Sequence, residues 1–535
     1  MTSQFDWPDW LAFCVYIALM SFTGWYFSQR TSNNARDYFL AGNSMPIWMV
    51  AVSVLATSQS AATFLGGPDQ GFRGDFSYLM TNIGAFIAAY VVAVALIPRF
   101  YQYKVGTVYE LLEQRFGASS KSQASVLYLF GRVFASGARL YMAGIAVSMI
   151  LFADIAAGSV ILSILLLTMA GLAYSFVGGI RSVIYSDVIQ CIVYVSAALA
   201  VIVSLLYAIP ADFSQIMDAL AHPHDRELSK LTLFDFRLDF TSAGVFTFWS
   251  ALIGFTLLNI AAFGLDQDIT QRMLSCKDAK SGSKALLWSI VMVIPVMLLF
   301  IFIGMLLYIF YLRPDLMLSE GGTMSDSFSG EKITVFMSYV LHEMPSGVRG
   351  LVTIGVVAAA LSTINSGLNA MSSVLVQDLY RPWLEKQKQG GSKAQPAEKH
   401  YVFAGQAGMT LSALALSGMA IICFYWQKSS DMPLLAFALS VMVFSYSGLL
   451  GVYFTALFTN RGSKTSVTWA FIAGFMVPLA LQPYTLQAYL PEGWRFDLGF
   501  TWQLCIGTLI AFFICVAAKP CRDLQQQWKL AEQRI

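Results

Sequence analysis

The sequence predicts an all-α integral membrane protein that crosses the bilayer many times. Of its 535 residues, 57% are hydrophobic and only 12% are charged, whereas an average soluble domain is about 25% charged. The apolar residues also gather in long runs, and a spanning helix needs about 20 mostly apolar residues in succession. The formal net charge is only +2, so the composition gives no indication of a nucleic-acid partner.

Thirteen runs are long and apolar enough to span the bilayer. They cover approximately residues 10–28, 45–68, 76–98, 124–152, 157–177, 184–208, 243–265, 285–311, 349–378, 403–426, 432–458, 467–483 and 499–518. None of the connecting loops has the length and composition of a soluble domain. Residues 1–535 are therefore expected to form a single polytopic domain embedded in the lipid bilayer.

The positive charges predict an orientation, because the cytoplasmic loops of membrane proteins are enriched in Lys and Arg. With the N-terminus outside, the inner loops hold more than twice as many Lys and Arg residues as the outer loops. We therefore expect an outer N-terminus and a cytoplasmic C-terminus, in a plasma (inner) membrane. Only Arg132 and Arg139 are then placed at membrane depth, both within the run 124–152.

Two of the runs contain stretches that predict broken helices. The second run, "VLATSQSAATFLGG", leads into Gly-Gly-Pro at residues 66–68, a sequence that ends or unwinds a helix. The seventh run ends "AAFGLDQDITQR", with Gly264 shortly before Asp266. A pair of interrupted helices five spans apart is typical of inverted-repeat transporters, whose binding site lies at the breaks. For the second run, an ordinary helix end with small residues for helix packing is the alternative.

Ionisable residues inside spans are costly and indicate functional sites. Asp187, in "VIYSDVIQ", lies about one turn inside the sixth run, where it is either a cation ligand or an acid at the membrane edge. Arg139 is either a binding group for an anion or the ion-pair partner of an acid such as Asp187. Arg132 lies seven residues earlier on a similar helix face and is the weaker candidate.

The ninth run carries an oxygen-rich stripe in "AAALSTINSGLNAMSS", residues 358–373. Ser362, Ser366, Asn369 and Ser373 recur at helical spacing and share one face. Close helix packing by small residues is one explanation. The other is a cation site, because hard cations require several oxygen ligands. Hydroxyl groups without net charge favour Na⁺ over Ca²⁺.

Four motifs together resemble those of the sodium:solute symporter family, which has the leucine-transporter-type (LeuT-like) fold. They are "SAATFLGGPDQGF", "SFVGGIRSVIYSDVIQ", "DQDITQRMLSCKDAKSGSKA" and "AAALSTINSGLNAMSSVLVQDLY". The resemblance extends over approximately residues 8–518. It implies an extra N-terminal helix (10–28), inverted five-helix repeats at 45–208 and 243–458, and two C-terminal helices within 467–518.

The resemblance also implies the coupling ion and its ligands. The shared sodium site of the family falls here on Ala56, Gln59, Ala359, Ser362 and Thr363. A second sodium site, present in some members, falls on Asp187, Ser362, Asn365 and Ser366. Members of the family often carry Ser where this chain has Asn365. The number of bound Na⁺ ions, one or two, therefore stays open.

Six positions match the substrate-facing positions of the family: Ser60, Thr63, Tyr78, Asn82, Arg139 and Asp266. Sugar-transporting relatives tend to have Gln at the position of Thr63 and Lys at the position of Met292, which argues against a glucose-type symporter. An arginine suits a carboxylate, because its planar fork donates two parallel hydrogen bonds. Sialic-acid-type members use one in this way.

The expected function is therefore sodium-coupled symport of a small carboxylate-bearing solute, such as sialic acid or another sugar acid, by alternating access. Sodium-coupled symport of a sugar, a monocarboxylate or proline is the alternative, as is a proton-coupled symporter of the same fold with Asp187 as the proton carrier. A membrane enzyme is not expected, because the sequence shows no clustered nucleophile, base or metal site.

Overall fold

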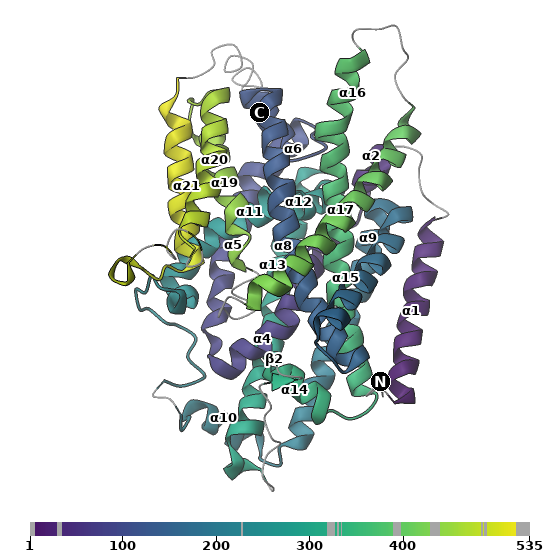
Figure 1. Cartoon of the computed structure of the whole chain (residues 1–535), viewed down its shortest axis with the longest axis vertical. Helices are drawn as coiled ribbons and strands as arrows, with labels where there is room; N and C mark the ends of the chain where they lie inside the picture. Colours follow the sequence, from purple (N-terminus) through teal and green to yellow (C-terminus); the bar gives the residue numbers. More distant parts are fainter. Residues whose placement is uncertain are drawn as a thin grey trace.

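A computed structural model describes most of the chain. The described residues are 6–28, 35–225, 228–317, 327–328, 331–332, 334–388, 397–428, 439–482, 485, 489 and 491–519. They form a bundle of long helices, with α1 along one side and α20 and α21 along the other (Figure 1). The prediction of an all-helical membrane protein is confirmed, since the only strands among the described residues are two that have two residues each.

The longer helices are α1 (Trp7–Ser28), α2 (Ala35–Leu40), α3 (Ile47–Ser58), α4 (Ala61–Arg73), α5 (Thr81–Val91), α6 (Ile97–Gln102), α7 (Glu110–Phe116), α8 (Ala118–Phe152), α9 (Ala157–Ala208), α10 (Phe213–Ala221), α11 (Thr256–Gly264), α12 (Gln267–Leu274), α13 (Ala279–Leu312), α14 (Val335–His342), α15 (Val348–Val374), α16 (Arg381–Lys388), α17 (Glu398–Lys428), α19 (Val443–Phe458), α20 (Lys464–Ala480) and α21 (Phe500–Ala517). Short 3₁₀ and π segments are η1 (Ala41–Asn43), η2 (Phe76–Met80), η3 (Val92–Leu96), η4 (Ser242–Phe246), η5 (Ser250–Phe255), η6 (Pro314–Leu316), η7 (Leu375–Tyr380) and η9 (Glu492–Trp494). The strands are β1 (Ser327–Phe328) and β2 (Glu331–Lys332), which pair antiparallel.

Among the described residues, seven helices are long and apolar enough to cross a membrane, or nine if each of two bent helix pairs is one span. The remaining predicted runs fall on α1, α8, α19 and α20. Of these, α19 and α20 are apolar but have 16 and 17 residues. The molecule is thus a multi-pass membrane protein, and the number of thirteen spans stays a prediction.

The second predicted run is a broken helix, but the break is not where the sequence placed it. α3 and α4 meet at a bend of 63°, at Gln59 and Ser60, and α4 then continues through Pro68. Ser60 starts the second half, because its hydroxyl accepts a hydrogen bond from the Ala62 amide at 3.2 Å. The prediction of a break at residues 66–68 is therefore wrong, by about two turns.

The glycines around Pro68 allow close helix packing instead. A Cβ on Gly67 would lie 2.9 Å from the Cβ of Phe300, and one on Gly71 would lie 2.1 Å from the carbonyl oxygen of Ile301. Both contacts are with α13, so these glycines let the backbones of α4 and α13 approach each other. The packing alternative was the correct one for this part of the run.

The seventh predicted run breaks at the expected place. α11 ends at Gly264 and α12 begins at Gln267, with a bend of 55° between the two halves. Asp266 caps α12, because its carboxylate accepts from the Asp268 amide at 3.0 Å. An acidic cap also interacts favourably with the positive end of the helix dipole.

α15 lies inside the bundle, and every residue from Val352 to Val374 is buried. It packs against α9, α8, α17, α1, α3 and α12. α9 is kinked at Gly179, where φ is +57° and an added Cβ would lie 2.5 Å from the Tyr38 carbonyl oxygen. α15 therefore brings its polar residues against several helices at once, including one half of each broken pair.

Candidate functional site

A cavity of about 140 Å³ lies beside both helix breaks. All six residues predicted to face the substrate line it: Ser60, Thr63, Tyr78, Asn82, Arg139 and Asp266. They come from α4, η2, α5, α8 and the start of α12. The cavity is also lined by residues that the sequence did not single out, among them Asn259, Met442 and Tyr446.

Two of the lining residues, Tyr78 of η2 and Asn82 of α5, are held by local contacts. The Asn82 amide donates to the Leu79 carbonyl oxygen at 3.0 Å and lies 3.2 Å from the sulfur of Met297. The ring of Tyr78 packs edge-on against Phe246, with centroids 4.9 Å apart. Tyr78 and Asn82 thus present a hydroxyl and an amide to the cavity from fixed positions.

Arg132 also lines the cavity, but its guanidinium is already paired. Nη1 lies 2.9 Å from the carboxylate of Asp266, and Nη2 contacts the carboxylate of Asp268. The Tyr446 hydroxyl donates to the same Asp266 carboxylate at 2.7 Å. All of these side chains are buried. Arg132 is therefore an internal counter-ion at the break before α12.

Arg139 differs from Arg132 in its surroundings. It is half-buried, and the described residues place no carboxylate within ion-pair distance of it. Among the described residues, its hydrogen-bond contact is to the sulfur of Met442 at 3.3 Å, and a thioether is a weak acceptor. Asp187, the alternative partner considered from the sequence, is paired elsewhere. Arg139 is thus the cation in the cavity that is available for an anion.

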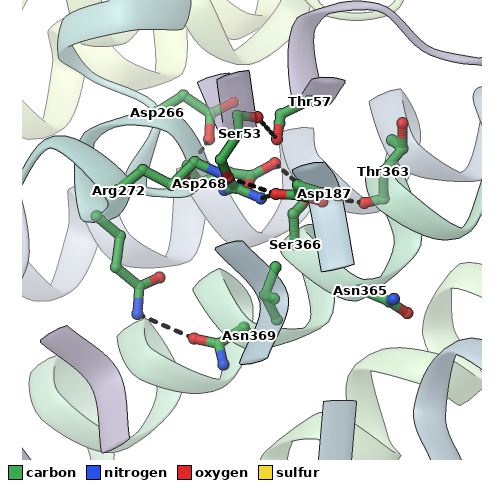
Figure 2. Close-up of polar contacts among 12 residues, drawn as sticks. Ser53, Thr57, Asp187, Asp266, Asp268, Arg272, Thr363, Asn365, Ser366 and Asn369 are labelled. Atoms are coloured by element: carbon green, nitrogen blue, oxygen red, sulfur yellow. Dashed lines mark hydrogen bonds and ion pairs between the residues drawn. The ribbon is translucent and has the colours of Figure 1, made fainter. Parts of the chain in front are cut away.

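Asp187 joins three helices at the centre of the molecule (Figure 2). Its carboxylate accepts from the Ser53 hydroxyl of α3 at 2.5 Å and from the Ser362 hydroxyl of α15 at 2.7 Å. It also lies 3.0 Å from Nη2 of Arg272. Asp187 is 0% exposed, so its carboxylate is held entirely by groups of the protein.

Arg272 is the main residue that the sequence reasoning misplaced. The charge count assigned it to a cytoplasmic loop, whereas the structure buries it to 1% exposure on α12. Its Nε donates to the Ser53 hydroxyl at 2.7 Å, and Nη1 donates to the Asp268 carboxylate at 2.6 Å. The four-residue spacing of Asp268 and Arg272 in "DQDITQR" was the available signal, since such pairs meet on one helix face.

The polar residues of α15 form hydrogen bonds with several different partners. Ser366 donates to the Asp268 carboxylate at 3.1 Å, and Asn369 accepts from the Gln271 amide at 3.0 Å. Thr363 donates to the Ala359 carbonyl oxygen within its own helix at 3.2 Å. These contacts tie α15 to α12 as well as to α9.

Asn365 does not join this group. Its amide points away from Asp187 (Figure 2) and lines a separate cavity beside α1. The predicted second sodium set of Asp187, Ser362, Asn365 and Ser366 is therefore brought together only in part. The predicted set omitted Asp268, whose carboxylate accepts the hydrogen bond from Ser366.

The predicted shared sodium site has oxygen atoms that fit a hard cation. The break at Gln59 leaves the carbonyl groups of residues 56–59, including that of Ala56, without donors from a following helical turn. In the described part of the chain, the buried Oε1 of Gln59 has no hydrogen-bond partner either. Ser362 and Thr363 lie on α15, which packs against α3. Carbonyl and hydroxyl oxygens of this kind are the ligands that hard cations require.

The buried charges around the two breaks balance. Asp187, Asp266 and Asp268 face Arg132, Arg139 and Arg272, so three negative charges accompany three positive ones within the described residues. Uncompensated charge is strongly disfavoured in such an interior. An anion or a cation entering alone would upset this balance, and the two entering together would keep it.

This fold and site define a membrane transporter, with a polar cavity where two spanning helices break. The model of the sodium:solute symporter family matches residues 38–474, and the chain belongs to this family. The members are sodium-coupled transporters of solutes and not enzymes, so the resemblance inferred from the sequence motifs is confirmed.

Two relatives and one solved structure are described as sodium-coupled sialic acid symporters. The chain is 26% identical to the sodium/sialic acid symporter SiaT of Proteus mirabilis over 466 residues, which cover 87% of each chain. It is 25% identical to the sodium/sialic acid symporter NanT of Aliivibrio fischeri over 516 residues, 96% of this chain and 93% of that one. The solved structure of a Na⁺-coupled sialic acid symporter in a substrate-bound, outward-open state has a TM-score of 0.77 at 23% identity, covering 96% of this chain and 97% of that one. The structural likeness shows a shared fold.

Proposed function

We propose that this protein imports a small carboxylate-bearing solute of the sialic acid type together with Na⁺, by alternating access. The observation that carries the proposal is Arg139, a cation in the cavity with no carboxylate partner among the described residues. A guanidinium can donate two parallel hydrogen bonds to a carboxylate. The SiaT and NanT relatives support a sialic acid in particular.

The solute would lie in the cavity between the breaks. Its carboxylate pairs with Arg139, while Ser60 and Thr63 of α4 and Tyr78 and Asn82 contact its hydroxyl or amide groups. Asp266 holds Arg132 and Tyr446, so its part is to keep the start of α12 in position.

The charge balance explains why ion and solute travel together. A carboxylate bound at Arg139 leaves one excess negative charge among the buried groups, and one Na⁺ removes it. Each Na⁺ that moves down a potential of 100 mV releases about 2.3 kcal/mol, and a tenfold sodium gradient adds about 1.4 kcal/mol. Because the solute carries one negative charge, one Na⁺ per cycle moves no net charge and supports a solute gradient of about tenfold, whereas two ions move one net positive charge and support about 5,000-fold.

The first sodium site is proposed at Ala56, Gln59, Ala359, Ser362 and Thr363. A second site at Asp187, Ser362 and Ser366 requires Arg272 to give up its contact with Asp187, and Asn365 joins it only if its side chain turns. We therefore propose one Na⁺ per cycle at the shared site and treat the second as conditional on that rearrangement.

The full architecture is part of the proposal. It has thirteen spans in one domain over residues 1–535: an outer N-terminal helix near 10–28, repeats at 45–208 and 243–458, and two further helices within 467–518. The N-terminus lies outside and the C-terminus in the cytoplasm of a plasma (inner) membrane. The paired breaks, one in each repeat, support this arrangement.

Uptake into proteoliposomes tests the function. Radiolabelled N-acetylneuraminic acid is offered with an inward Na⁺ gradient, and in parallel with choline replacing Na⁺ at fixed pH. We expect concentrative uptake with Na⁺ only. Equal uptake in choline would contradict sodium coupling and favour the proton-coupled alternative. Stronger competition by proline, a monocarboxylate or a neutral sugar than by a second sialic acid would contradict the solute class.

A further inference from the structure

A second cavity lies where α1 packs against the rest of the bundle. It encloses about 650 Å³, a volume within the usual range for small-molecule sites. Its walls come from α1, α8, the first part of α9 and α15. Of the described residues that line it, none is charged, and most are apolar.

The inner wall of this cavity carries an unsatisfied polar side chain. Asn365 is 0% exposed, and neither its Nδ2 nor its Oδ1 has a hydrogen-bond partner in the parts of the chain that the structure describes. The hydroxyl of Tyr16, another lining residue, is also buried and lies beside Gln190. Buried polar groups are normally hydrogen-bonded, and leaving an amide unsatisfied is destabilising. The cavity therefore has an apolar body and a polar inner end.

The outer rim of the cavity is formed by exposed hydrophobic side chains. Ile17 and Trp25 of α1 are 48% and 58% exposed, and Leu166 of α9 is 48% exposed. α1 stands at the edge of the bundle (Figure 1). In a membrane-spanning chain, exposed apolar residues of this kind face lipid. A molecule that enters this cavity therefore comes sideways from the bilayer.

The chemistry of the lining restricts the occupant. A purely hydrocarbon chain would leave the Asn365 amide unsatisfied, and a charged head group would find no counter-charge in the lining. The amide offers both a donor and an acceptor, which a hydroxyl or an amide can match. We propose that this cavity binds a neutral single-chain amphiphile from the bilayer, whose hydroxyl or amide head group hydrogen-bonds to Asn365.

The site adjoins the centre of the molecule. Asn365 lies on α15 between Ser362, which contacts Asp187, and Ser366, which contacts Asp268. A Cβ on Gly171 would lie 3.0 Å from Oδ1 of Asn365, so the amide borders α9 directly. Binding of the amphiphile does not depend on sodium symport, and it is measured without transport.

Photolabelling of the full-length protein tests the proposal. The protein is placed in nanodiscs of phosphatidylcholine and phosphatidylglycerol with octadecanol that carries a diazirine on its chain, and labelled peptides are located by mass spectrometry. We expect labels on α1 and on the first part of α9. Unlabelled octadecanol should compete about tenfold better than octadecane, the effect of one hydrogen bond, and better than octadecyltrimethylammonium.

Three substitutions define the site. Ala173→Trp and, as a second variant, Ala170→Trp add bulk from exposed positions in the lining and should lower labelling at least about fivefold by filling the cavity. Met169→Trp is the matched control, since Met169 is exposed on the same helix and does not line the cavity. Asn365→Leu should remove the preference for octadecanol over octadecane, a ratio that does not depend on the amount of folded protein.

Two results would overturn the proposal. The first is unchanged labelling in both Trp variants, which would show that the label does not enter this cavity. The second is equal competition by octadecane, or stronger competition by the charged amphiphile, in the wild-type protein. Equal competition by octadecane would identify ordinary acyl-chain filling without recognition by Asn365.

Discussion

The guanidinium of Arg272 lies 3.0 Å from the carboxylate of Asp187, and both side chains are at most 1% exposed. The same guanidinium lies 2.6 Å from Asp268, so one arginine connects α12 to α9. Ser53 of α3 touches both members of the pair. α3 and α12, one half of each broken helix, are thereby joined through a single ionic group.

Removing both members of this pair should destabilise the protein by less than the sum of the two single losses. Asp187→Asn leaves Arg272 with one carboxylate fewer, and Arg272→Gln leaves Asp187 without a cation and Asp268 with Arg132 alone; each should lower the free energy of unfolding by about 3 kcal/mol. The double variant should be more stable than the sum of the two losses predicts, by about 1–3 kcal/mol. Thermal unfolding in detergent, followed by intrinsic fluorescence, provides the measurement.

Strict additivity of the two substitutions would show that the pair makes no energetic contribution of its own. Arg73→Gln is a suitable control, because Arg73 lies on the surface with its side chain 63% exposed and is paired with Asp69. Surface ion pairs contribute about 0–1 kcal/mol, so this variant should unfold close to the wild type.

Arg139→Gln should abolish the binding of a carboxylate solute and leave sodium binding in place. Truncating one partner of a charged hydrogen-bonded pair costs about 2–5 kcal/mol, which corresponds to a loss of affinity of about 30-fold to 5,000-fold. Solute binding is followed by isothermal titration calorimetry, and sodium binding by the sodium-dependent shift in thermal unfolding.

Arg139→Lys separates charge from geometry. It keeps the positive charge and loses the planar fork, so its affinity should lie between those of the wild type and Arg139→Gln. Unchanged solute affinity in Arg139→Gln would contradict the carboxylate assignment.

Ser362→Ala should raise the sodium concentration that gives half-maximal uptake by about tenfold, because it removes one oxygen ligand from the proposed shared site. Sodium-dependent uptake in proteoliposomes at saturating solute is the measurement. Ser373→Ala is the matched control on the same helix, since the hydroxyl of Ser373 is buried and has no partner among the described residues. An equal shift in both variants, or none in Ser362→Ala, would count against the site.

Gly71→Ala should destabilise the protein by about 1–3 kcal/mol, the usual range for overpacking. The added Cβ would lie 2.1 Å from the Ile301 carbonyl oxygen, whereas at Gly418 no atom comes within 4 Å of an added Cβ. Gly418→Ala should be neutral or slightly stabilising, since alanine favours the helix. Equal thermal stabilities of the two variants would show that α4 and α13 are not in close contact.

Much of the fold was predictable because it depends on local composition. Apolar runs predicted the spanning helices, and Gly264 before Asp266 predicted the second break at the right residues. The six residues expected to face the solute all line one cavity, although their contacts with a solute stay a prediction. These expectations rested on membrane physics and on motifs, and neither needs knowledge of distant neighbours.

The failures came from contacts between residues far apart in the sequence. From the sequence alone, Gly67 and Gly71 could either unwind a helix or allow a neighbouring helix to pack closely. Their contacts with Phe300 and Ile301 of α13 show that they allow close packing. Arg272 was counted as a loop cation because a charge count cannot show that a short helix after a break returns to the interior.

Asn365 lies away from Asp187, contrary to the predicted second sodium set, for a geometric reason. It precedes Ser366 by one residue, and adjacent residues on a helix point about 100° apart. On a helix with one buried face, that difference separates the core from the surface. On α15, which is buried all round, it separates the neighbourhood of Asp268 from that of α1.

The complete burial of α15 also determines how much sequence change the protein tolerates. From Val352 to Val374 no side chain reaches the surface, so away from the cavity beside α1 a larger residue must displace a neighbour, and any new charge must find a counter-ion. α1, with nine large apolar side chains exposed along its length, accepts almost any hydrophobic residue at those positions. A saturation mutagenesis library should therefore lose nearly every bulky or charged variant of α15 while it retains hydrophobic variation along α1.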